Sequence, residues 1–225
     1  MREVQEVLVL AATPIEAALL RSLPSALVIT GIGAVNTSHA LTRQLATHPR
    51  PSLVIQTGIA GAYVPAGVPV GSVVLANEEI YADVGVMTTD GWRSAEEIGI
   101  PLVEASATRP ARFNSFPCDA HLVMRASAIC GSRVARTGRF LTLSQVTGVR
   151  TLGDALHERF GALCESMEGA AAAHVCALHD VPFLEVRGIS NLVEERDRSK
   201  RRIEEAAEAA QSVVRHLLEH AAELT

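Results

Sequence analysis

The fold of this chain is decided by residues 26–57, which read ALVITGIGAVNTSHALTRQLATHPRPSLVIQT. The apolar run over 26–30 predicts a strand, Gly31-Ile32-Gly33 predicts a turn, and residues 35–47 predict a helix. Residues 53–57 form a second apolar run, typical of a strand that is buried on both faces. A strand, a helix and a strand in this order predict a mainly parallel sheet.

Segments on both sides of this stretch extend the same architecture. We expect further strands over 7–12, 70–76 and 183–189, and helices over 167–178 and 199–223. A single hydrophobic core can hold this chain of 225 residues, because chains usually divide into domains only beyond roughly 250 residues. We therefore expect one α/β domain over residues 1–225, with a central mixed, largely parallel sheet flanked by helices.

Composition and charge exclude several classes of protein. The chain is 48% apolar and has no low-complexity tract, which is typical of a globular protein. The net charge of −5 argues against a nucleic-acid partner. No apolar run reaches the roughly 20 residues of a membrane span, and the first six residues lack the features of a signal peptide. We expect a soluble, cytoplasmic protein without a membrane partner.

The cysteines and histidines do not predict a metal site. The four cysteines form no Cys-x-x-Cys pair, so we expect reduced thiols. Cys118 with His121, and Cys176 with His179, supply two donors each, whereas structural zinc takes four. We therefore expect no bound metal.

Glu16 has two interpretations. In the segment Thr13-Pro14-Ile15-Glu16, Thr13 suits a helix N-cap and Glu16 the third position of a capping box. The same segment places a carboxylate at the carboxyl end of a strand, where open α/β sheets bind their ligands. The sequence leaves both interpretations open.

Two glycine segments follow predicted strands. Gly31-Ile32-Gly33-Ala34-Val35-Asn36 resembles the start of a dinucleotide fingerprint, but Asn36 occupies the third glycine position. Thr57-Gly58-Ile59-Ala60-Gly61 predicts a second turn, whose backbone N–H groups can approach a ligand. Tight connections between strands and helices are the alternative explanation for both.

A polar cluster is predicted near the end of the strand over 183–189. Met167 and Glu168 begin a helix, and the helix dipole alone explains a carboxylate there. It does not explain Arg187, Ser190 and Asn191, which follow one another where an apolar strand leaves the core. Converging polar groups of this kind indicate a binding site.

These segments together resemble the nucleoside phosphorylase and nucleosidase superfamily, and within it the futalosine hydrolase family. The resemblance covers almost the whole chain and rests on residues 12–16, 31–36, 57–61, 166–169 and 187–191. The ending over 187–191, continued by 195–199, is what resembles the futalosine branch. The resemblance implies hydrolysis of futalosine to hypoxanthine and a dehypoxanthine ribosyl product, a step in menaquinone synthesis, without a cofactor.

The resemblance also implies a role for each site residue. Glu16 would orient and deprotonate the attacking water with help from Arg187, while Glu168 and Met167 would hold the ribose. Ile59, Ala60 and Gly61 would line the water and ribose side, Ser190 would complete the substrate contacts, and Phe140 with Leu141 would flank the purine.

Asn191 carries the expected base preference. Related adenine nucleosidases have an aspartate at this position. An asparagine amide can donate to a purine O6 and accept from a protonated N7, which suits hypoxanthine. Alternatives are a 5′-methylthioadenosine or S-adenosylhomocysteine nucleosidase, a purine nucleoside phosphorylase, and a non-catalytic nucleotide-binding module built on Gly31 and Gly33. A carboxylate at position 16 disfavours the phosphate that a phosphorylase binds.

The resemblance further implies a homo-oligomer, a dimer or a dimer of dimers. Phe113 or Phe116 would enter the neighbouring subunit's site. Arg139 or Arg112 would pair with the carboxylate on the distal aromatic part of the substrate.

Overall fold

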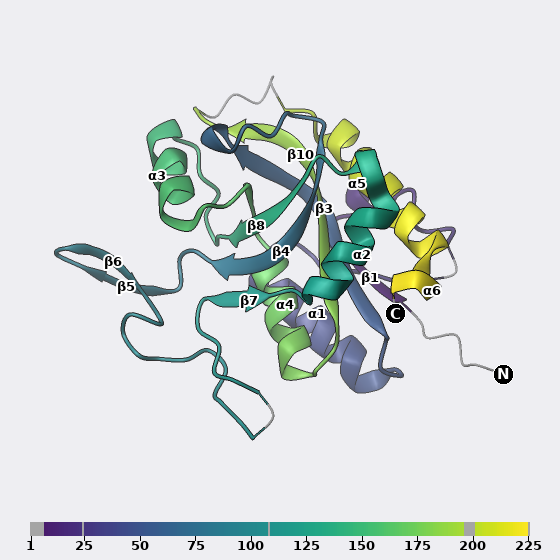
Figure 1. Ribbon diagram of the computed structural model, residues 1–225, viewed down its shortest axis with the longest axis horizontal. Helices are drawn as coiled ribbons and strands as arrows, with labels where there is room; N and C mark the ends of the chain where they lie inside the picture. Colours follow the sequence, from purple (N-terminus) through teal and green to yellow (C-terminus); the bar gives the residue numbers. More distant parts are fainter. Residues whose placement is uncertain (1–6, 24, 108, 196–200, 225) are drawn as a thin grey trace.

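The computed structural model describes residues 7–23, 25–107, 109–195 and 201–224. Its main sheet has eight strands in the order β10-β4-β8-β9-β3-β1-β2, with β7 paired to β4. The strands are β1 (Val7–Ala11), β2 (Ala26–Ile29), β3 (Leu53–Tyr63), β4 (Val73–Tyr81), β5 (Gly85–Thr88), β6 (Gly91–Ser94), β7 (Ser115–Pro117), β8 (Arg136–Thr142), β9 (Cys164–Ser166) and β10 (Phe183–Val193). The hairpin of β5 and β6 stands apart from this sheet (Figure 1).

The sheet curls on itself. β10 pairs with β4 on one side and with β3 on the other, so the strands β10, β4, β8, β9 and β3 form a closed ring. The pairs of β1 with β2 and β3 are parallel, whereas β3 with β9 and β10 with β4 are antiparallel. The predicted class, an α/β fold with a mixed and largely parallel sheet, is confirmed.

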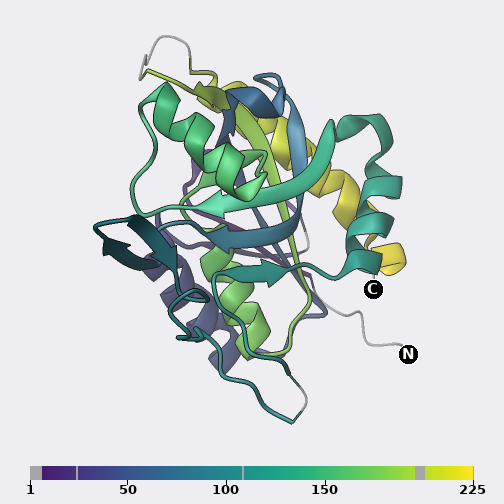
Figure 2. The same cartoon turned by 60° about the vertical axis from the view of Figure 1, so that its left-hand side comes forward.

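Helices cover the sheet on both sides (Figure 2). They are α1 (Ala34–Thr47), α2 (Ala120–Cys130), α3 (Arg150–Phe160), α4 (Gly169–Leu178), α5 (Ile203–Glu219) and α6 (Ala221–Leu224), with single 3₁₀ turns at Ile15–Ala17, Val64–Ala66 and Gly131–Arg133. Apolar side chains of α2 and α5 pack on one side against β1, β3, β4 and β10. Those of α1 and α4 pack against the other face of β1 and β3. Among the described residues, no helix is long and apolar enough to cross a membrane.

β3 and β10 continue beyond their predicted ends, through segments that carry site residues. The glycine segment Thr57–Gly61, predicted as a turn, lies inside β3 and keeps its pairing with β10. Gly58 has a φ of +157°, and a Cβ at this position would lie 2.5 Å from both Glu16 Oε1 and Arg187 Nη1. Glycine is therefore required at position 58 because it leaves the space that the Glu16 and Arg187 side chains occupy, and not because the chain turns there. β10 likewise runs to Val193, so Arg187, Ser190 and Asn191 lie within the strand.

The predicted C-terminal helix is present but shorter and divided. It begins at Ile203 and ends at Glu219, and His220 separates it from the short α6. Its predicted start at Ser199 lies outside the described residues, as do positions 196–199 of the segment that resembles futalosine hydrolases.

Candidate active site

A cavity of about 400 Å³ lies beside the C-terminal ends of β1 and β9 and the inner parts of β3 and β10. All of the predicted site residues except Phe140 and Leu141 line it: Glu16, Ile59, Ala60, Gly61, Met167, Glu168, Arg187, Ser190 and Asn191. Segments that are far apart in the sequence thus meet around one space.

Glu16 is held on the wall of the cavity by two donors. Its Oε1 accepts a hydrogen bond from the Ile59 N–H at 3.0 Å, and its Oε2 accepts one from the Thr13 hydroxyl at 2.7 Å. Of the two interpretations of Glu16, the capping box is wrong. The helix is a single 3₁₀ turn whose N-cap is Pro14, without a side-chain cap bond, because the Thr13 hydroxyl is directed to the Glu16 carboxylate. The buried Glu16 therefore faces the cavity and does not cap a helix.

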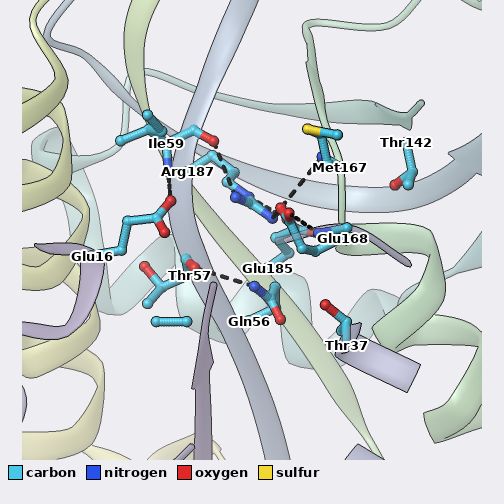
Figure 3. A network of polar contacts seen from close by, with 12 residues as sticks. Glu16, Thr37, Gln56, Thr57, Ile59, Thr142, Met167, Glu168, Glu185 and Arg187 are labelled. Carbon is cyan, nitrogen blue, oxygen red and sulfur yellow. Dashed lines mark hydrogen bonds and ion pairs between the residues drawn. The ribbon is translucent and has the colours of Figure 1, made fainter. Parts of the chain in front are cut away.

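Arg187 is buried at the centre of the polar network (Figure 3). It forms ion pairs with Glu185 and, at 3.1 Å, with Glu168, and its Nη1 donates to the Ile59 carbonyl oxygen at 3.0 Å. Burial alone would lower the pKa of Arg187, but the carboxylates of Glu185, Glu168 and Glu16 raise it above its ordinary value. The guanidinium is permanently charged. It links Glu168 to Ile59, whose N–H binds Glu16.

Glu168 is fixed from three sides. It stands at the N-cap of α4, its Oε1 accepts from the Gly33 N–H at 2.9 Å, and its Oε2 accepts from Arg187 and from the Met167 N–H. The glycine turn that resembles a dinucleotide fingerprint thus binds a carboxylate of the protein itself. This contact removes the main argument for a nucleotide-binding module.

Ser190 and Asn191 are placed by an irregularity in β10. The register between β10 and β3 shifts between Ile189 and Asn191, as in a β-bulge, which redirects side chains. The Ser190 hydroxyl lies 3.2 Å from the Ala60 carbonyl oxygen and 2.9 Å from Asn191 Oδ1. The Asn191 amide donates to the Leu192 carbonyl oxygen at 2.9 Å. A Cβ at Gly61 would lie 3.2 Å from the Asn191 amide nitrogen, so this glycine makes room for Asn191.

The structure places Phe140 and Leu141 outside the cavity. Both are fully buried on β8, within the hydrophobic core between β3, β4 and β9. The loop after β8 brings Val146 and Thr147 to the cavity instead. The Thr147 N–H donates at 2.7 Å to the buried Glu165, whose other oxygen accepts from the Tyr63 hydroxyl at 2.9 Å. Burial raises the pKa of Glu165.

The entrance of the cavity differs from its interior. Four partly exposed aliphatic side chains and one arginine line it: Ile15, Ile32, Val146, Ile203 and Arg201. We call these five residues the rim. Ile32 is 56% exposed and Ile203 is 36% exposed. No sequence pattern indicated the rim, because its residues come from four separate segments.

The residues expected to serve the distal carboxylate and a neighbouring site lie elsewhere. Arg139 pairs with Glu78 at 2.6 Å, and Arg112 lines a different groove. Phe116 is buried and stacks on His174 with ring centroids 4.7 Å apart, so it cannot reach a neighbour without unpacking the core. Phe113 is half-buried.

The sequence profile of the phosphorylase superfamily matches residues 7–219. This chain belongs to that superfamily. A futalosine hydrolase from Thermus thermophilus is 36% identical over 84% of the chain and 79% of its own length, and one from Streptomyces coelicolor is 39% identical over 72% of the chain and 63% of its own length. The chain thus spans somewhat less than two thirds of the Streptomyces protein.

More distant superfamily members share the fold. A 5′-methylthioadenosine/S-adenosylhomocysteine nucleosidase from Mycobacterium tuberculosis is 29% identical over 72% of the chain and 67% of its own length. The crystal structure of such a nucleosidase from Neisseria meningitidis, in complex with methylthio-immucillin-A, has a TM-score of 0.79 at 21% identity and covers 96% of this chain and 99% of that one. Among the described residues of the present chain, no group of three or more His, Cys, Asp and Glu side chains is arranged to hold a metal ion.

Proposed function

We propose that the protein hydrolyses the N-glycosidic bond of futalosine and releases hypoxanthine. The observation that carries this proposal is the Glu16 carboxylate, which is buried, held by Ile59 and Thr13, and exposed only toward the cavity. The two futalosine hydrolases similar to this chain support the choice of substrate.

The chemistry follows from the charges around the cavity. Cleavage of a nucleoside develops positive charge on the ribose and negative charge on the leaving base, as in glycoside hydrolysis generally. Glu16 accepts a proton from the attacking water as the water oxygen bonds to C1′, and the base leaves with the electron pair of the broken bond and takes up a proton from solvent. Glu168 faces the sugar side with Met167. The carboxylates of Glu16 and Glu168 favour the developing positive charge.

Water is a better nucleophile for this site than phosphate. A phosphorylase binds a phosphate dianion beside C1′, and the Glu16 carboxylate repels an anion there. Arg187, the buried cation on the wall of the cavity, is already paired with Glu168 and Glu185. In a phosphorylase, the carboxylates of Glu16 and Glu168 would both face the bound phosphate.

The base side supports a 6-oxopurine. Asn191 lines the cavity next to Ser190, and its amide offers one donor and one acceptor edge. Hypoxanthine matches this pair through O6 and a protonated N7. An adenine nucleosidase is the second candidate function, supported by the mycobacterial relative, and release of adenine from methylthioadenosine would favour it.

The rim supports a nucleoside that carries an apolar, anionic substituent. Ile15, Ile32, Val146 and Ile203 provide apolar contacts, and Arg201 provides a positive charge at the same entrance. The carboxylated aromatic part of futalosine has this combination. We therefore assign its carboxylate to Arg201, in place of Arg139 or Arg112.

The test uses purified protein with futalosine, inosine and methylthioadenosine, each with and without phosphate, and follows the released base by chromatography. Hypoxanthine release from futalosine at the same rate with and without phosphate is expected. Dependence on phosphate would indicate a phosphorylase.

We further infer that the protein acts in the cytoplasm and assembles as a homo-oligomer, a dimer or a dimer of dimers. The four free cysteines fit a reducing compartment. Val35, at the start of α1, is 83% exposed beside the rim residue Ile32, which fits a subunit contact near the cavity. Light scattering at several protein concentrations measures the number of subunits.

A further inference from the structure

Two carboxylates lie together behind Arg187 and have no part in the proposed chemistry. Glu79 on β4 and Glu185 on β10 are both fully buried. Both carboxylates reach the first residue of α4, Gly169, where any added side chain would collide with Glu185 Oε2 and Glu79 Oε2. Glycine at this position therefore leaves the space in which the two carboxylates meet.

Arg187 is the only cation paired with these two carboxylates among the described residues, and of the two it contacts only Glu185. Glu185 uses Oε1 for its ion pair with Arg187. Its Oε2 and both oxygens of Glu79 are buried and accept no hydrogen bond from a donor among the described residues. Two ionised carboxylates in contact, without a donor between them, are strongly unfavourable in a buried environment. One proton between them removes a charge and supplies the missing hydrogen bond.

Titratable groups on several packed elements surround Glu79, and among those that shift its pKa only Arg187 favours the ionised form. Glu78 and Tyr81 on β4, Cys118 after β7, Cys164 on β9 and Arg187 on β10 are the titratable groups that act on the pair or respond to it. Burial, followed by the Glu185 carboxylate, raises the pKa of Glu79 well above its ordinary value. Burial also raises the pKa of both thiols, so they stay neutral. Arg187 is the one cation among these groups.

We propose that Glu79 and Glu185 share one proton and act as a positioning pair that fixes Arg187 for the reaction. The shared proton turns one oxygen of Glu185 toward Glu79 and leaves the other for the Arg187 Nε. The remaining guanidinium nitrogens then reach Glu168 and the Ile59 carbonyl oxygen, and the Ile59 N–H reaches Glu16. Through Arg187, the pair thus positions both carboxylates that face the cavity. This inference rests on the proposed function only where it concerns the reaction.

The first test detects the proton directly and needs no substrate. The infrared spectrum of the wild-type protein at neutral pH should contain the C=O band of a buried, protonated carboxylic acid. Glu79→Gln should remove this band. Glu78→Gln is the matched control, because Glu78 is the next residue on β4 but pairs with Arg139 near the surface, and it should keep the band. Absence of the band in wild type, or its persistence in Glu79→Gln, would overturn the proposal.

The second test measures positioning with the nucleoside that the wild-type enzyme cleaves fastest. Glu185→Gln removes the charge that holds Arg187, and kcat should fall about 10- to 150-fold, because a hydrogen bond to a charged group contributes about 1.5–3 kcal/mol. Glu79→Gln still donates to Glu185 and should keep kcat within about threefold at neutral pH. It should also lack the alkaline loss of kcat that ionisation of Glu79 causes in wild type.

The outcomes separate this inference from the proposed function. If wild type cleaves another nucleoside but not futalosine, the proposed substrate fails and both tests still apply. If Glu185→Gln is as active as wild type, or if Glu79→Gln keeps the wild-type alkaline limb, the positioning role is wrong. If either variant does not fold, the infrared band of wild type and its titration at alkaline pH still decide whether the proton is present.

Discussion

The interior wall and the rim of the cavity are built in opposite ways. On the wall, Glu16, Glu168 and Arg187 are buried and each makes at least two polar contacts within the protein. On the rim, Ile32 and Ile203 are partly exposed aliphatic residues beside Arg201. A network that constrains its own members holds groups at fixed positions, as bond cleavage requires. A partly exposed rim of aliphatic residues and one arginine can select substrates by contact area and charge. Under the proposed function, bond cleavage therefore belongs to the wall, and recognition of the distal part of the substrate belongs to the rim.

The largest effect should come from the wall. Glu16→Gln keeps the shape of the side chain and can still accept from Ile59, but it cannot take a proton from water. We expect kcat to fall by about 10²- to 10⁴-fold, the range for a general base, with little change in nucleoside affinity measured by calorimetry. Glu96→Gln, an exposed position in the loop after β6, is the control. Wild-type turnover in Glu16→Gln would show that the wall does not supply the base.

Asn191→Asp tests whether base preference also belongs to the wall. A protonated aspartate donates to N7 and accepts from an adenine amino group, so the ratio of adenosine to inosine cleavage should rise. The expected change is about 5- to 150-fold, since an unpaired buried polar group costs about 1–3 kcal/mol. Competition between the two nucleosides in one reaction measures the ratio. An unchanged ratio would place base recognition on another residue.

The buried carboxylate pair behind the wall should also be more sensitive to pH than the rim. The pKa of Glu79 is raised in the folded protein by burial and by Glu185. Its contribution to stability is therefore full below the unfolded pKa of about 4.3 and is lost as pH rises toward the folded pKa. Because glutamine does not titrate, Glu79→Gln should gain stability relative to wild type as pH rises, by up to about 1.4 kcal/mol per pH unit. Urea unfolding at several pH values measures this, and parallel curves would refute the raised pKa.

The smallest effect should come from the rim. Arg201→Gln should raise KM for futalosine by up to about fivefold, since exposed ion pairs contribute about 0–1 kcal/mol. KM for inosine, which lacks the anionic substituent, should not change. An equal rise for both nucleosides would mean that Arg201 does not distinguish substrates and that the rim has no part in substrate choice.

The sequence predicted the wall far better than the rim. Glu16, Glu168 and Arg187 stand in motifs that resemble a superfamily, and each lies in or directly beside a regular element. The rim residues come from the start of a 3₁₀ turn, a glycine turn, a loop and the approach to α5, and only the folded chain brings them together. No local pattern marks such residues.

The errors in the expected elements have physical causes. The sequence predicts a turn at Gly58 and Gly61, but β3 continues through both residues. They are glycines because Glu16, Arg187 and Asn191 occupy the space that a side chain would fill. Phe140 and Leu141 were expected beside the purine, but β8 buries them and its following loop reaches the cavity. No motif marks Glu185, but a carboxylate inside an apolar strand and two residues before Arg187 is a signal for a buried ion pair.

The most direct measurement of the central claim is the release of base from futalosine by purified wild-type protein, compared with Glu16→Gln, in buffer with and without phosphate. The account predicts one hypoxanthine per futalosine consumed by wild type, at a rate that phosphate does not change, and a rate reduced by at least about 10²-fold in Glu16→Gln. Release that requires phosphate, or equal rates for the two proteins, would contradict it.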